Sequence, residues 1–191
     1  TIDSLSLNTD NKRYLYDSSL RAASIETPHY TLSKLLLFNK TVNDTLFFKS
    51  IFKGGASEKE KFNLDFYYTI NKDEKSVLGI EKSTFNYLEN IWDLNPENNS
   101  NNKLTFDFNT NEYVFSPFTL KSKEQEVNFK GIIRDSTFKE IDVDFTNVYL
   151  KSFLPEIDSL KLRGQLDGVI NISQVEGIYL SLIHISEPTR R

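Results

Sequence analysis

Strict alternation of apolar and polar residues constrains the fold of this chain more than any other feature. Between Ser159 and Ile172, leucine, isoleucine and glycine occupy one parity, and mostly charged or amide residues occupy the other. Successive side chains of an extended strand point to opposite faces of a sheet, so the pattern predicts a strand with one apolar face. At about 3.3 Å per residue the stretch would extend about 45 Å, which is longer than a usual strand. It therefore either bends at Gly164 and Gly168 or belongs to an unusually long sheet.

The same alternation recurs upstream, at Phe62, Leu64, Phe66, Tyr68 and Ile70 and again at Leu104, Phe106 and Phe108. Strand-like segments follow one another about every ten residues, and no segment has a sustained helical period. Two of them flank Gly54 and Gly55, which indicates a hairpin. A single helical turn is expected within Lys151–Glu156. The pattern predicts an all-β fold, either a sandwich, a barrel or an extended meander.

Composition argues against several classes of function. The chain has 191 residues and a net charge of −4 without a long basic run, so nucleic acid is not expected as a partner. It has no cysteine, which excludes disulfides and thiolate metal sites. No segment approaches the roughly 20 apolar residues of a membrane-spanning helix.

Few residues suit catalysis. The histidines are His29, which follows a proline and is expected in a surface turn, and His184. Carboxylates are plentiful, but they occupy the polar parity of strands, where a solvated sheet face explains them: Asp65, Asp107, Asp142 and Asp144. We therefore expect no catalytic residue, no metal site and no cofactor, and a protein that is not an enzyme.

We do not expect the two ends of the chain to be those of a natural protein. Leu180–Arg190 resembles the translation of a transposase-type sequencing adapter. We therefore expect residues 1–179 to be a fragment of one extended β domain and residues 180–191 to be a non-native tail, which removes His184 from consideration. Thr1 is not expected to be a natural start, because a strand-like pattern already begins at Ile2.

Residues 70–179 resemble the TamB translocation and assembly module family, in its Bacteroidetes form and within the wider AsmA-like group. The order and spacing of five segments carry the resemblance: Trp92–Pro96, Gly131–Thr137, Ile141–Phe145, Pro155–Gly164 and Leu166–Ile172. Members are anchored in the inner membrane by one N-terminal helix. They cross the periplasm as a long curved β-sheet with a hydrophobic groove. The family is implicated in moving phospholipid toward the outer membrane and in assembling outer-membrane proteins, with an outer-membrane barrel of the TamA type as partner.

The resemblance implies that the apolar parity lines a groove for phospholipid acyl chains and that the chain is a periplasmic portion of an inner-membrane-anchored protein. The expected lining residues are Phe62, Leu64, Phe66, Tyr68, Ile70, Leu104, Phe106, Phe108, Leu160, Leu162, Leu166, Ile170 and Ile172, with Gly164 and Gly168 providing curvature. The favoured fold is thus a long curved antiparallel meander sheet.

Two alternatives remain open at the level of sequence. The first is a β-sandwich or solenoid binding module of the cell surface, which recognises sugar or protein through polar loops. It predicts two packed sheets and a fully buried apolar parity. A carbohydrate-active β-solenoid enzyme ranks below it. Whether the apolar side chains around Leu162 face protein or an open trough separates the sandwich from the groove.

Overall fold

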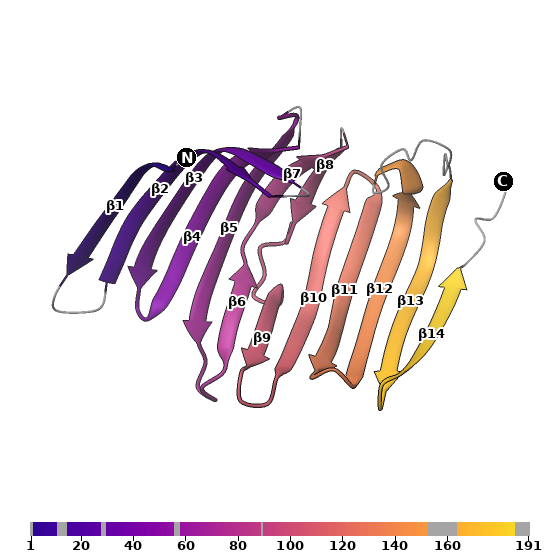
Figure 1. Cartoon of the computed structure of the whole chain (residues 1–191). Helices are drawn as coiled ribbons and strands as arrows, with labels where there is room; N and C mark the ends of the chain where they lie inside the picture. Colours follow the sequence, from indigo (N-terminus) through magenta and orange to yellow (C-terminus); the bar gives the residue numbers. More distant parts are fainter. Residues whose placement is uncertain are drawn as a thin grey trace.

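The structure is a computed structural model that describes residues 2–10, 15–27, 30–55, 58–88, 90–152 and 164–185. Fourteen strands form one sheet in which every neighbouring pair is antiparallel (Figure 1). The predicted all-β class and meander sheet are confirmed. All the described strands belong to this one sheet, so the two packed sheets of the alternative, a sandwich, are not seen among them.

The strands include the alternating segments predicted at residues 62–70 and 104–106. Their bounds are β1 Ile2–Asp10, β2 Leu15–Glu26, β3 Thr31–Val42, β4 Thr45–Gly54, β5 Glu60–Ile70, β6 Ser76–Ile80, β7 Ser83–Tyr87, β8 Asn90–Leu94, β9 Lys103–Asp107, β10 Glu112–Ser122, β11 Gln125–Arg134, β12 Phe138–Tyr149, β13 Gln165–Val175 and β14 Ile178–Ile185. A 3-10 turn, η1, spans Leu150–Ser152 and overlaps the start of the expected helical turn. Within the described ranges, no helix is long and apolar enough to cross a membrane.

The overlong strand expected from Ser159 to Ile172 is described only in part. β13 begins at Gln165, directly after Gly164, and continues three residues beyond Ile172 to Val175. Leu160 and Leu162 lie outside the described residues, as does His29. The expected non-native tail begins inside β14, which pairs with β13.

The meander is interrupted at its centre. β6 and β7 both pair with β5, one after the other, while β9 and β8 both pair with β10. Two long strands between β5 and β10 are thus each broken in the middle, so that the β7–β8 hairpin lies above the β6–β9 pair (Figure 1).

Buried asparagines close the interruption. The Asn95 side chain is 1% exposed. Its Nδ2 donates to the carbonyls of Ile80 at 2.7 Å and Asn99 at 2.9 Å, and its Oδ1 accepts from Asn102 Nδ2 at 3.0 Å. Asn102 Oδ1 in turn accepts from the backbone N–H of Thr119 in β10 at 2.9 Å. Because buried backbone groups need partners, these amides replace the ladder bonds that the broken strands cannot make.

Strand pairing places the apolar residues of successive strands on one face of the sheet. Residues directly opposite each other in neighbouring strands share a face, so the chain of partners can be followed from strand to strand. Phe66 of β5 lies opposite Phe48 of β4 and Ile80 of β6. Ile141 of β12 lies opposite Gly131 of β11 and Ile172 of β13. We call this side the apolar face and the other side the charged face.

β-Bulges keep the apolar residues on that face where the sequence parity changes. In β10 the apolar positions switch from Tyr113 and Phe115 to Phe118 and Leu120, and the pairing register shifts between Phe115 and Phe118. A bulge places one extra residue in one strand, so odd positions before it and even positions after it face the same way. Pro117 lies within this bulge, where its missing N–H is tolerated.

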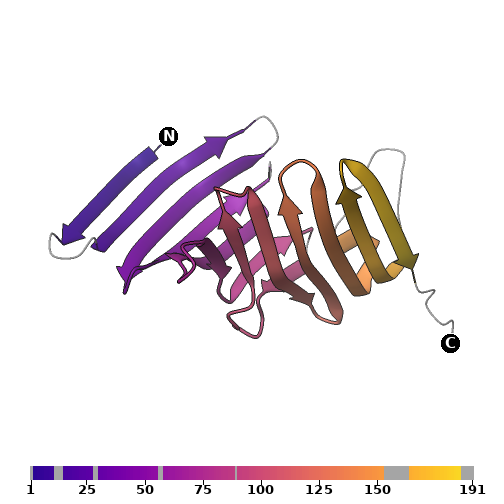
Figure 2. The same cartoon turned by 90° about the horizontal axis from the view of Figure 1, so that it is seen from below.

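The sheet is curved rather than flat. Seen from below, the strand direction rotates along the sheet and the C-terminal strands bend away from the plane of the first ones (Figure 2). Register shifts also occur in β3 and β12, and bulges increase local twist. The backbones of β11 and β12 approach closely at Gly131, where an added Cβ would lie 2.4 Å from the Glu140 carbonyl oxygen.

A compact hydrophobic core occupies one part of the apolar face. Trp92 is 0% exposed and forms a cluster with Val127 and Val148. Six half-buried side chains of β7, β10, β12 and β13 pack against this cluster: Phe85, Tyr87, Leu120, Val143, Phe145 and Leu166. Tight packing on the apolar face is thus concentrated around β8, β11 and β12.

Replacing Asn95 with alanine tests the role of the interruption. The variant leaves the Ile80 and Asn99 carbonyls without their side-chain donor, so we expect the free energy of unfolding in urea to fall by about 2–4 kcal/mol. Asn101→Ala, an exposed position in the same loop, is the control and should change it by less than about 0.5 kcal/mol. Equal effects of the two substitutions would contradict a structural role for Asn95.

Candidate functional site

The apolar face is the most extensive chemically uniform feature of the molecule. It carries nine of the predicted lining residues by register, namely Phe62, Leu64, Phe66, Tyr68, Leu104, Phe106, Leu166, Ile170 and Ile172. All nine are half-buried rather than fully buried. An apolar face packed against a second layer would be mostly inaccessible to water.

Two other predicted lining residues lie at strand ends. Ile70 is the last residue of β5 and is 60% exposed, although it shares the apolar face through Ser76. Phe108 follows the end of β9 and is 69% exposed, with its ring 5.0 Å from that of Phe106 in an edge-to-face arrangement. Both therefore mark the border of the apolar face. Leu160 and Leu162, the remaining two, lie outside the described part of the chain.

Aromatic rings form rows across the strands of this face. Phe52, Phe62 and Phe85 stack across β4, β5 and β7, with ring centroids 4.5 Å and 5.8 Å apart. Phe48 and Phe66 stack at 4.9 Å two rows further along, beyond the pair of Ser50 and Leu64. Cross-strand aromatic pairs each contribute roughly 0.2–1 kcal/mol and hold the register. The rows therefore form a continuous apolar surface as well as stabilising the sheet.

Charge is almost absent from the apolar face. Following the register from β3 through β13, only Glu60 and Lys139 fall on it, and both lie near a strand end. Glu60 accepts a hydrogen bond from the Tyr30 hydroxyl, which lies over Gly54. Burial and then this bond to Glu60 raise the pKa of Tyr30 above its usual value, so the hydroxyl stays protonated. Lys139 donates to the Tyr179 hydroxyl at 2.9 Å.

The charged face is organised as cross-strand ion pairs. Lys49 and Asp65 are direct partners with Nζ and Oδ2 3.2 Å apart. The pairs Lys121–Glu126, Lys130–Asp142 and Arg134–Glu112 follow the same rule, at 3.4 Å, 3.5 Å and 2.8 Å. Each exposed pair of this kind adds little stability. Together, however, the pairs place many charged side chains on a face that contacts water.

Two of the four carboxylates considered for catalysis lie in these ion pairs. Asp65 pairs with Lys49, and Asp142 pairs with Lys130 and accepts from the Asn171 amide. Asp107 accepts from the backbone N–H of Asn109 at 2.8 Å, and this bond is the main cause of its lowered pKa. Asp144 lies on the charged face opposite Asn128. No group of three or more His, Cys, Asp and Glu side chains that could hold a metal occurs among the described residues.

The two glycines predicted to provide curvature both have unusual backbone angles. Gly168 has φ +145° and pairs with Phe145 at the edge of the β12 bulge. Gly164 has φ +141° and directly precedes β13. L-residues rarely adopt such angles, so glycine is required by the backbone at both positions. That they set the curvature of the sheet stays a prediction.

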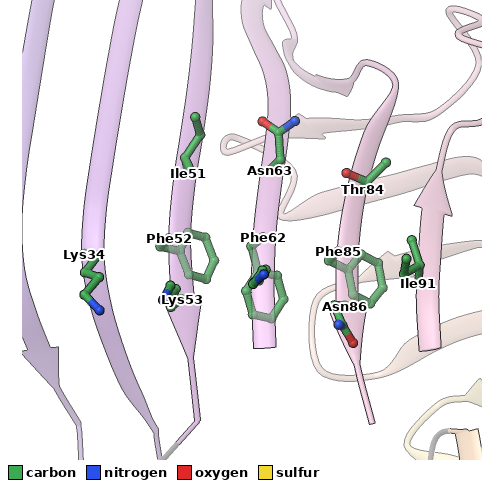
Figure 3. Close-up of a pocket in the computed structure, with 11 residues that line it drawn as sticks. Lys34, Ile51, Phe52, Lys53, Phe62, Asn63, Thr84, Phe85, Asn86 and Ile91 are labelled. Carbon is green, nitrogen blue, oxygen red and sulfur yellow. The ribbon is translucent and has the colours of Figure 1, made fainter. Parts of the chain in front are cut away.

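A hollow of about 580 Å³ lies over β3, β4, β5, β7 and β8, and sequence reasoning missed it (Figure 3). Three of its lining residues, Phe52, Phe62 and Phe85, belong to the stacked row of the apolar parity. Seven others share the charged face by register. The described residues that line it are Lys34, Ile51, Phe52, Lys53, Lys61, Phe62, Asn63, Thr84, Phe85, Asn86 and Ile91. They come from strands far apart in sequence, which no local pattern reveals.

Comparison of the chain with models of protein families, with curated proteins and with solved structures found no match. The resemblance to the TamB family therefore stays a prediction.

Acid titration tests the electrostatics of the charged face at Glu112. Hydrogen bonds from Arg134 and Lys75 lower the pKa of Glu112 below its ordinary 4.5. A lowered pKa in the folded state stabilises the fold above the unfolded value, and this stabilisation is lost as the pH falls through the folded value. We expect Glu112→Gln to cost about 1 kcal/mol in urea unfolding at pH 7 and almost nothing at pH 2 to 3.

Glu124→Gln is the matched control, because Glu124 is exposed in the β10–β11 turn and forms no ion pair with another described residue. Its effect should be small at both pH values. A cost for Glu112→Gln that does not depend on pH would contradict the assignment.

Proposed function

We propose that the chain is a non-enzymatic segment of a hydrophobic trough that holds the acyl chains of phospholipids. The observation that carries the proposal is the half-exposed apolar face, which runs from β3 to β13 almost without charge. Leaving such a face in water is unfavourable by roughly 25 cal/mol per Å² of apolar area, so it needs an apolar partner.

Acyl chains suit this face for three reasons. They are apolar and flexible, so they can follow a curved surface that carries rows of aromatic rings. The face offers few charged groups that would lose hydration beneath them, because most charged side chains lie on the other side of the sheet. An extended apolar surface also allows movement along the sheet.

The cellular setting of the proposal comes from the resemblance to the TamB family. It has the segment lie in the periplasm as part of an inner-membrane-anchored protein, with phospholipid moving toward the outer membrane. Assembly of outer-membrane proteins with a TamA-type barrel would then depend on parts of the full protein beyond this segment. Fractionation of cells that express the complete gene tests this setting separately from lipid binding.

A matched pair of aspartate substitutions tests the lipid-binding surface. Phe66→Asp places a carboxylate on the apolar face beside Phe48. Phe38→Asp makes the same change on the charged face, at a residue that is 40% exposed and directly opposite Lys49. After incubation with phosphatidylethanolamine and phosphatidylglycerol vesicles, bound lipid is extracted from the repurified protein and quantified by mass spectrometry.

We expect Phe66→Asp to lower the bound phospholipid about tenfold or more, because a carboxylate covered by an acyl chain loses its hydration. Phe38→Asp should retain nearly the wild-type amount. Circular dichroism and urea unfolding check that both variants keep the fold. Recovery of no phospholipid with the wild type, or equal recovery with both variants, would sink the proposal.

A further inference from the structure

We propose that the hollow on the charged face binds an organic phosphate, with the phosphate held by Lys53 and Lys61 and an attached apolar group lying against the apolar wall at Ile91. The site lies on the side of the sheet opposite the apolar face, so it does not depend on the proposed lipid trough. The hollow, the lysine pair and the polar donors beside it carry the argument.

The lysine pair is the first part of the argument. Lys53 of β4 and Lys61 of β5 are direct cross-strand partners, and like charges in that position destabilise a sheet. Glu58 lies 3.8 Å from Lys53, but it is held more closely by Lys34 at 2.6 Å. Lys61 forms no ion pair with any other residue that the structure describes. Lys34 and Lys53 thus share one carboxylate, Lys61 has none within the described residues, and an anion would relieve the repulsion between Lys53 and Lys61.

A second pair of like charges on the same face is neutralised by neighbouring residues. Asp107 and Glu112 are also direct partners. Lys75 and Arg134 lie 3.2 Å and 2.8 Å from the Glu112 carboxylate and neutralise it. The lysine pair has no comparable set of partners among the described residues. Its positive charge is therefore available to bind a ligand.

The hollow supplies the rest of a ligand site. Its volume of about 580 Å³ lies within the range of small-molecule pockets and well exceeds the size of a free phosphate ion. Asn63, Thr84 and Asn86 lie beside the lysines on the same face and provide amide and hydroxyl donors. No acidic residue is among the described residues that line it. Ile91 is exposed at the far wall, where it can cover an apolar group (Figure 3).

A phosphate monoester fits this arrangement better than a single carboxylate. It carries close to two negative charges and three acceptor oxygens, which match two ammonium groups and the neighbouring donors. Lysine binds such groups as a point charge and does not need the planar geometry of arginine.

Calorimetric titration at low salt tests the site with phenyl phosphate, with inorganic phosphate as the comparison ligand. We expect phenyl phosphate to bind saturably and more tightly than inorganic phosphate. Lys61→Gln should weaken its binding about tenfold, the effect of one lost charge-assisted hydrogen bond. Lys130→Gln makes the same change of charge elsewhere on this face, and should leave binding within about twofold of wild type.

Lys61→Glu separates a binding role from a structural one. A glutamate opposite Lys53 replaces repulsion with attraction, so we expect a higher midpoint of urea unfolding together with loss of phenyl phosphate binding. A purely structural lysine pair would not give this combination. Vesicles that contain phosphatidic acid, a lipid whose headgroup is a phosphate monoester, then distinguish the sources: competition with phenyl phosphate indicates a lipid headgroup, and its absence indicates a soluble organic phosphate.

Three results would overturn the proposal. The first is the absence of saturable binding of phenyl phosphate up to about 10 mM, because a specific site should be largely occupied at that concentration. The second is an equal loss of binding in Lys61→Gln and Lys130→Gln, which would indicate a general effect of charge. The third is equal affinity for phenyl phosphate and inorganic phosphate, which would leave the apolar wall without a role.

Discussion

The alternation of side chains along an extended strand is the constraint on which the rest of this molecule depends. Direct partners in each antiparallel pair lie on the same face of the sheet. A slip of one residue would therefore move every side chain of a strand to the opposite face. The register avoids this from β3 to β13, where apolar residues gather on one side. Two chemically distinct faces result from a single layer of strands.

The bulges show that the sequence and the register are matched in detail. In β3 the apolar parity changes between Leu32 and Leu35, and in β12 it changes between Phe145 and Val148. A regular strand would bring the later residues to the charged face. The register shifts at these points return them to the apolar face and bend the sheet as they do so.

Sequence reasoning reached the strands and the shared apolar parity, because both follow from local alternation at residues such as Phe62 to Tyr68. It did not reach the interruption at the centre of the sheet. The run of asparagines from Asn95 to Asn102 reads as a loop by composition, and only the fold shows that two of them are buried and replace ladder bonds. The alternation of Leu160 and Leu162 falls outside the described residues.

The hollow could not be predicted from the sequence either, because it depends on which strands become neighbours. Lys53 and Lys61 are eight positions apart around a Gly-Gly loop, and a hairpin was expected there. Their direct opposition follows only from the register, and Ile91 joins them only through the pairing of β7 with β5 and β8. Long-range pairing, rather than residue type, thus determines the second candidate site.

A cysteine scan of β5 tests the central claim most directly, because the chain has no native cysteine. Single cysteines at positions 62 to 69 are labelled with an environment-sensitive fluorophore and titrated with phospholipid that carries bromine on its acyl chains. If acyl chains lie on the apolar face, quenching will alternate with a period of two, strong at 62, 64, 66 and 68 and weak at 63, 65, 67 and 69. Quenching without alternation, or strongest at the odd positions, would contradict the account.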